Sequence, residues 1–346
     1  MNPLAKRKGV LFSLLILILF ATIVISVMIG TTGPLLGAGG EPQMGMNEFF
    51  SALLGGDSET YRTIIREVRL PRVLLAGLVG CGLALSGCTM QAIFRNPLAD
   101  PYLLGISSGG AAGAALSMFT GLKGYEGVTL PLFAFLGGLG AVFLVYILTW
   151  TTCRGRIKME ILLLAGVAVG SFFGAVTSFL MYAAGMQFRY LWFWLLGGFT
   201  STSWDKVILA YIPIMIGCVC ICIFARELNA LLLGEEHAMY LGVNVNTLKR
   251  VLICIVSLIT GVCVAFSGII GFVGLIIPHA VRLLLGPDHR VLLPASCIVG
   301  GSFLIWADVI ARSALASGGV EVPVGIITAL FGAPFFLYIL IRRRRW

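Results

Sequence analysis

The stretch VLLAGLVGCGLALSGCTMQAIF, residues 73–94, decides the fold of this chain. Its 22 residues contain no Asp, Glu, Lys or Arg, and a charged residue stands on each side of it, Arg72 and Arg95. An apolar helix of about 20 residues is long enough to cross the hydrocarbon core of a bilayer. The stretch therefore predicts a membrane-spanning helix over residues 72–94.

Similar apolar runs, bounded by charges or by Gly and Pro, recur along the whole chain. A backbone immersed in lipid must satisfy its own hydrogen bonds, and a single apolar run does so as a helix. The eighth run is too short to cross at full thickness, so we expect it to pack inside protein. The ten predicted spans are residues 10–30, 72–94, 101–120, 129–152, 160–184, 205–225, 249–270, 273–286, 291–312 and 323–341.

The composition supports one transmembrane domain over residues 1–346. The chain is 59% hydrophobic and 11% charged, which is too apolar for a soluble domain and predicts an all-α polytopic membrane protein. Its net charge of +9 comes from basic residues spread between the apolar runs, so we interpret it as a topology signal and do not expect nucleic-acid binding. The nine cysteines and three scattered histidines predict neither a disulfide framework nor a metal site.

The basic residues also predict which way the chain runs. An even number of spans puts both termini on one side, and the basic ends, Lys6–Lys8 and Arg342–Arg345, place that side in the cytosol. Residues 31–70 are then an extracytoplasmic loop, and residues 226–248 form a cytoplasmic segment. This segment contains short amphipathic pieces broken by Gly234 and Gly242, which suit small helices beneath the membrane. Such helices can carry force from a cytosolic motor or serve as plain connectors.

Four arginines lie together on the predicted outer side, against the prevailing charge bias. Spacings of four, three and three residues would put Arg62, Arg66, Arg69 and Arg72 on one face of a helix. A patch of one sign raises the association rate with a partner of the opposite sign. We therefore interpret the cluster as a docking surface for an acidic partner.

Residues that recur at a fixed separation in the sequence indicate an inverted internal repeat. Five spans separate the second span from the seventh, so the two copies run in opposite directions, as in transporters whose pathway lies between the halves. The proposed halves are residues 71–184 and 249–341. The recurring residues are Gly80, Ala84, Ser86, Gly87, Pro97, Leu104 and Gly105, which match Gly261, Ala265, Ser267, Gly268, Pro278, Leu285 and Gly286 at positions 181 residues later.

The sequence contains no recognised motif for nucleotide binding or catalysis. It has no GxxxxGK[ST], HExxH or GxSxG motif, so we expect no ATP site and no catalytic residues. The energy source is then an ion gradient or another polypeptide. Mid-membrane acids, which ion coupling requires, are scarce, and Asp308 lies one helical turn from Arg312, where an ion pair is the simpler interpretation. A separate ATPase is favoured, with a gradient-driven secondary transporter as the alternative.

Three glycines on the fifth span, Gly166, Gly170 and Gly174, form a ridge without side chains. Such a ridge usually serves close helix packing. A role in widening a pathway for a bulky solute is the alternative.

Several motifs together resemble the FecCD/BtuC-type permeases, which are membrane subunits of ABC importers for ferric siderophores, haem and cobalamin. The resemblance runs from about residue 60 to the end of the chain. The motifs are RLPR (69–72), SGCTMQAIFRNPLADPYLLGISSGG (86–110), LLLAGVAVG (162–170), LLLGEEHAMYLGV (231–243), SGIIGFVGLIIPHAVR (267–282), ADVIAR (307–312) and EVPVGIITALFGAPFF (321–336).

The resemblance implies a BtuC-like type II ABC importer fold in the plasma (inner) membrane of a prokaryote. It also implies a second copy of the permease, two cytosolic ATPases that bind ATP and Mg, and an extracytoplasmic binding protein. The implied cargo is a bulky metal chelate, with a metal oxyanion such as molybdate as the alternative.

The resemblance further implies roles for particular residues, with no cofactor in this chain. Docking of the binding protein is assigned to Arg69, Arg72 and Arg312. Arg62 and Arg66 extend the positive electrostatic field of these three residues. Coupling to the ATPase is assigned to Gly234, Glu235, Ala238, Leu241 and Gly242. For the gate at the inner mouth we propose Met159 and Glu160, next to the Gly166, Gly170 and Gly174 ridge.

Overall fold

The structure is a computed structural model that describes residues 3–29, 62–121, 127–184, 188–313 and 321–343. Within these ranges the chain forms thirteen α-helices, one π-helical turn and one short 3-10 helix, and no strand. This confirms the all-helical fold. Most of the predicted outer loop, residues 30–61, and the last basic residues, 344–346, lie outside the described residues.

Each of the ten predicted spans contains a helix. Seven of the described helices are long and apolar enough to cross a membrane, while the helices over residues 273–285 and 324–338 are shorter apolar segments. The helices in the ten spans are α1 (Pro3–Met28), α4 (Leu70–Ile93), α5 (Ile106–Thr120), α6 (Thr129–Thr152), α7 (Met159–Ala183), α9 (Trp204–Ile223), α12 (Val245–Ser267), α13 (Val273–Leu285), α14 (His289–Ser313) and α15 (Val324–Arg343).

Helix α4 lies at the centre of the bundle, packed against α9, α12, α13 and α14. Glycines let its backbone come very close to its neighbours: a Cβ on Gly80 would collide with the carbonyl of Gly300 in α14, and one on Gly87 with that of Gly274 in α13. Close helix approach through small residues is typical of membrane bundles, because lipid supplies no hydrophobic force between helices.

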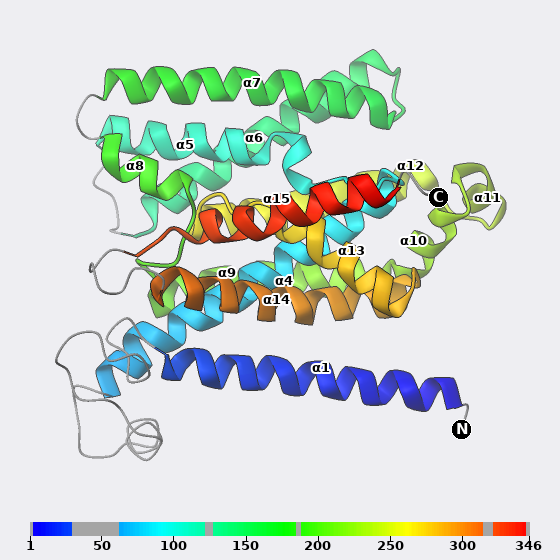
Figure 1. Ribbon diagram of the computed structural model, residues 1–346. Coiled ribbons are helices and arrows are strands. Elements are labelled where there is room, and N and C mark those ends of the chain that lie inside the picture. The colour runs from blue at the N-terminus through cyan, green and yellow to red at the C-terminus, as the bar shows by residue number, and fades with distance from the viewer. Residues whose placement is uncertain (1–2, 30–61, 122–126, 185–187, 314–320, 344–346) are drawn as a thin grey trace.

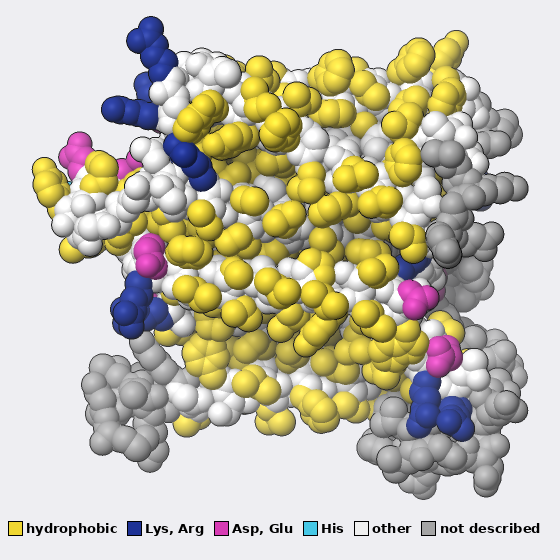
Figure 2. All heavy atoms as spheres, turned by 180° about the vertical axis from the view of Figure 1, so that it is seen from behind, with side chains coloured by type: hydrophobic (Ala, Val, Ile, Leu, Met, Phe, Trp, Pro, Cys, Tyr) yellow, Lys and Arg dark blue, Asp and Glu magenta, His cyan; other side chains and the backbone are white. Residues whose placement is uncertain are grey.

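The outer surface of the bundle is apolar between two charged ends. Figure 2 shows hydrophobic side chains over the middle of one face, with Lys, Arg, Asp and Glu confined to its two sides. Large apolar side chains such as Leu17, Phe143 and Leu164 are exposed on α1, α6 and α7. Such a band is what a protein presents to lipid, as the composition predicts.

The two ends of the bundle differ in the elements they carry. Helix α1 begins and α15 ends where α10 (Ala225–Leu232) and α11 (Glu235–Tyr240) protrude, and we call this the α11 end (Figure 1). The opposite end carries the short helix α8 (Phe188–Leu195), and we call it the α8 end. The termini therefore lie at one end, as an even number of spans requires.

The two predicted repeat copies have opposite directions. Helix α4 runs from the α8 end to the α11 end, and α12 runs the other way (Figure 1). Gly105 and Gly286, which correspond in the repeat, both have positive φ, of 80° and 87°. A positive φ favours glycine, but ψ is 9° at Gly105 and −179° at Gly286, so the two copies use glycine at this position in different turns.

Two elements were not predicted from the sequence. A π-helical turn over Ile64–Arg69 leads directly into α4, and α8 lies between α7 and α9. The π-helical turn changes which side chains share a face, and this affects the arginines described below.

Candidate functional site

Asp308 is the centre of a buried charge cluster at the α8 end. Its carboxylate is 1% exposed and accepts hydrogen bonds from Arg72, whose Nε lies 3.1 and 3.0 Å from the two oxygens and whose Nη2 lies 2.9 Å from Oδ1. The Nε of Arg312 lies 3.4 Å from Oδ2. Arg72 Nη1 also contacts Glu321, at 3.0 Å from Oε1 and 2.9 Å from Oε2. The cluster therefore joins α4, α14 and the segment that precedes α15.

Two arginines of this region hold the end of α1. Arg69 Nη1 donates to the carbonyls of Val27 and Met28, at 3.2 and 3.1 Å. Arg312 donates to the carbonyl of Ile29 at 2.8 Å, and to the carbonyl and hydroxyl of Ser26 at 2.9 and 2.6 Å. The last carbonyls of a helix have no partner within the helix and carry partial negative charge. The two guanidinium groups satisfy them.

The prediction that four arginines share one exposed face is wrong. Arg62 is exposed and Arg66 is half-buried, whereas Arg69 and Arg72 are buried. The physical reason is that the π-helical turn and the packing of α4 carry Arg69 and Arg72 inward, where carboxylates and carbonyls hold them. The expected contact of Asp308 with Arg312 is present. Whether any of these arginines meets a partner protein stays a prediction.

The predicted coupling residues lie in and around α11. Gly234 and Gly242 bracket this helix with positive φ values of 115° and 85°, and Ala238 is buried against the bundle. Glu235 pairs with Lys249 at the start of α12, Nζ to Oε1 2.6 Å. These contacts fix the base of the helix.

The tip of α11 is apolar although it projects beyond the bundle (Figure 1). Met239, Tyr240 and Leu241 are exposed, Tyr240 at 90% and Leu241 at 65%. We call these three residues the α11 tip. Apolar groups gathered in this way outside the lipid-facing band are typical of a protein interaction site.

The predicted gate residues lie at the start of α7. Met159 is half-buried against the hydrophobic core, and Glu160 is exposed. On the glycine ridge, only Gly166 packs tightly, against the carbonyl of Leu103. Gly170 faces Ser108 at an ordinary distance, and Gly174 faces open space. Close packing therefore explains the first glycine of the ridge but not the third.

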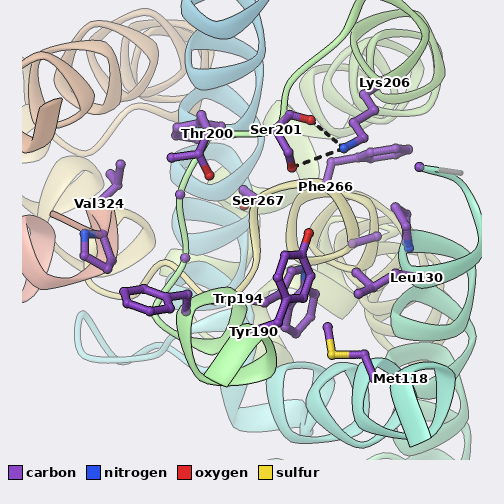
Figure 3. Close-up of a pocket in the computed structure, with 18 of the residues that line it drawn as sticks. Met118, Leu130, Tyr190, Trp194, Thr200, Ser201, Lys206, Phe266, Ser267 and Val324 are labelled. Atoms are coloured by element: carbon purple, nitrogen blue, oxygen red, sulfur yellow. Dashed lines mark hydrogen bonds between the residues drawn. The ribbon is translucent and has the colours of Figure 1, made fainter. Parts of the chain in front are cut away.

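A cavity of about 650 Å³ opens at the α8 end beside the charge cluster. Figure 3 shows Phe266 beside Lys206, with Tyr190 and Trp194 lower in the view. The amino group of Lys206 donates to the carbonyl and hydroxyl of Ser201, at 2.5 and 3.3 Å. Arg72 and Glu321 also line the cavity, so a solute there would meet aromatic and charged groups together.

The comparisons place this bundle among transport proteins. Residues 18–342 match the FecCD transport family. The chain belongs to the FecCD transport family. It is 46% identical over 304 residues to the cobalamin import system permease protein BtuC of Halobacterium salinarum. This alignment covers 88% of this chain and 80% of the relative. It is 42% identical over 283 residues to the hemin transport system permease protein HmuU of Yersinia pestis, covering 80% and 83%.

The fold of this FecCD chain is also that of a solved structure. A structure described as an inward-facing conformation of a metal-chelate type ABC transporter superposes with a TM-score of 0.82 at 34% identity, covering 96% of this chain and 99% of the other. This confirms the resemblance to BtuC-type permeases and their fold. The chain is a multi-pass membrane permease, a transport subunit and not an enzyme, of a family that works with an ATPase and a binding protein.

Some contacts that organise these FecCD sites could not be predicted from the sequence. Glu321 and Asp308 follow Arg72 by 249 and 236 residues, so no local spacing relates them. Nothing local distinguishes Lys249 from the other basic residues of the sequence, yet it is buried and pairs with the half-exposed Glu235.

Proposed function

We propose that this chain forms the translocation pathway of an ABC importer for a bulky metal chelate. Two copies would surround the pathway in the plasma membrane of a prokaryote, with the α11 end in the cytosol. The observation that carries the proposal is the difference between the ends: an exposed apolar tip at one, and a cavity beside exposed and buried arginines at the other. Two named relatives import cobalamin and hemin, which are both large metal chelates.

The α11 end would be the part of the permease that the ATPase moves. In this proposal the α11 tip is seated on a cytosolic ATPase, which binds ATP and Mg, while Gly234, Ala238 and Gly242 set the shape of the segment. Glu235 holds the base of α11 to α12 through Lys249. A movement of the ATPase then reaches two long helices of the bundle.

The gate and the pathway would be formed where two copies meet. Helix α7 is suited to this role because only 22% of its span is buried within one copy. Met159 and Glu160 begin this helix at the α11 end, and Gly170 and Gly174 leave room along it. We therefore assign the gate to the start of α7.

A binding protein would dock at the α8 end. Acidic groups on it would meet Arg62 and Arg66 first, since these are the more exposed arginines of the set. Arg69, Arg72 and Arg312 lie beneath this surface. They contribute to docking through the electrostatic field of the charge cluster. The proposal separates steering by the first pair from structural support by the second set.

Charge reversal at Arg62 and Arg66 tests this docking. We expect the Arg62→Glu, Arg66→Glu variant to associate with its binding protein about tenfold more slowly at low salt, because steering depends on opposite charge. The control is Arg290→Glu, the same change at the exposed start of α14 on the other side. The rates are measured by stopped-flow fluorescence. An unchanged association rate would argue against docking at this patch.

The function itself is tested by reconstitution. The permease is placed in proteoliposomes with its partner ATPase, and uptake is measured with a binding protein loaded with cobalamin, haem, a ferric siderophore or molybdate. We expect uptake that requires internal ATP and one of the three chelates. Uptake driven by an ion gradient without the ATPase would support a secondary transporter instead, and uptake of molybdate alone would assign an oxyanion cargo.

A further inference from the structure

We propose that Asn229 is the positioning residue that transmits movement of the α11 tip to α14. This inference rests on the proposed coupling of α11 to an ATPase, and it assigns the mechanical connection to one amide side chain. Asn229 lies on α10, the short helix directly before α11, and its partners lie at the first turn of α14.

Three hydrogen bonds form this junction. The Oδ1 of Asn229 accepts from the backbone N–H of His289 at 2.8 Å and lies 2.9 Å from its Nδ1. The Nδ2 of Asn229 donates to Oδ1 of Asp288 at 2.8 Å. An amide is suited to this position because it presents an acceptor to His289 and a donor to Asp288 at once. An ionised aspartate, which has the same shape, could only accept.

Packing makes the junction stiff. His289 is fully buried, Asn229 and Asp288 are half-buried, and the buried Leu228 and Leu231 fix α10 beside them. Hydrogen bonds away from water are costly to leave unmade, so α10 and the start of α14 move together. The pair Glu235–Lys249 is a second connection, from α11 to α12, but the Glu235 side chain is 45% exposed and solvent weakens such a pair.

Helix α14 leads from this junction to the other end of the bundle. At about 1.5 Å per residue, its 25 residues span about 37 Å. Asp308 and Arg312, near its last turn, hold α4 and α1. A displacement at Asn229 is therefore delivered to the charge cluster of the α8 end by a single helix.

The first test separates coupling from stability. In proteoliposomes with the ATPase and binding protein, Asn229→Ala is expected to keep ATP hydrolysis but to transport about tenfold less solute per ATP. The control is Asn244→Ala, which removes an asparagine whose side chain accepts a hydrogen bond from Thr247 in its own segment and from no other residue that the structure describes. A structural defect would lower hydrolysis and transport together, so an unchanged ratio of the two in Asn229→Ala would overturn the proposal.

The second test exchanges the two partners. In the double variant Asn229→Asp, Asp288→Asn, a carboxylate still accepts from His289 while the new amide at 288 donates across the junction. Asparagine caps the start of a helix as well as aspartate does, so α14 is preserved. We expect both single variants to lose transport per ATP and the double variant to recover most of it. A double variant as impaired as Asn229→Asp alone would contradict the proposal.

These outcomes differ from a failure of the proposed function. If the wild-type complex shows no ATP-dependent uptake, the importer assignment is wrong. If it does and Asn229→Ala keeps the wild-type ratio, only the role of Asn229 is wrong.

Discussion

Replacing Asp308 with alanine is expected to destabilise the folded permease by about 3–5 kcal/mol, because it leaves buried positive charge without its partner. Asp308 is the one carboxylate that both Arg72 and Arg312 contact among the described residues. The variant should lose much of its monodisperse peak at temperatures where the wild type keeps it. The measurement is the midpoint of heat-induced loss of that peak in size-exclusion chromatography in detergent.

Glu321 supplies the matched control. It contacts the same Arg72, but its side chain is 26% exposed, so water can replace the lost charge in Glu321→Gln. We expect this variant to lower the midpoint far less than Asp308→Ala. Equal midpoints for Asp308→Ala and the wild type would show that the cluster does not hold the bundle together. By the same reasoning, Arg72→Glu would damage folding and is unsuitable as a docking test.

Placing acidic groups on the α11 tip is expected to weaken ATPase binding by about 100-fold, since central apolar contacts often contribute about 2 kcal/mol or more each. The variant is Tyr240→Asp, Leu241→Asp. Both side chains are mostly exposed, so the permease should fold normally. Affinity is measured by the binding of purified ATPase to the permease in nanodiscs.

Glu236→Gln is the control for the α11 tip. Glu236 is exposed on the same helix, and its replacement changes charge without removing apolar area. It should keep wild-type affinity. If the tip variant also binds the ATPase normally, the residue 226–248 segment is a plain connector, which is the alternative interpretation of its sequence.

The helices could be predicted because hydropathy is a local property. Each apolar run stands between charges or helix-breaking residues, so its position follows from about 20 consecutive residues. Helix α8 was missed because its eight residues, FRYLWFWL, are too few to span a membrane and carry no clear boundary. The π-helical turn was missed because nothing in IIREVR distinguishes it from an α-helix.

The sites could be predicted only in part, since their residues pair across the chain. The arginines were identified from their charge on the outer side, but their burial depends on Asp308, Glu321 and the end of α1. Asn229 gave no signal at all, because its partners follow about 60 residues later in a different helix. Local patterns locate such residues without stating what they bind.

The capped end of α1 has a consequence for how the protein is made. Arg312 lies 283 residues after Ile29, so its contribution to the cap cannot form until the ribosome has released nearly the whole chain. Until then, lipid and the hydrogen bonds from Arg69 to Val27 and Met28 hold α1. Biogenesis therefore includes a late step, in which α14, the second-last helix, secures the first, and truncation before residue 312 should leave α1 open to proteases.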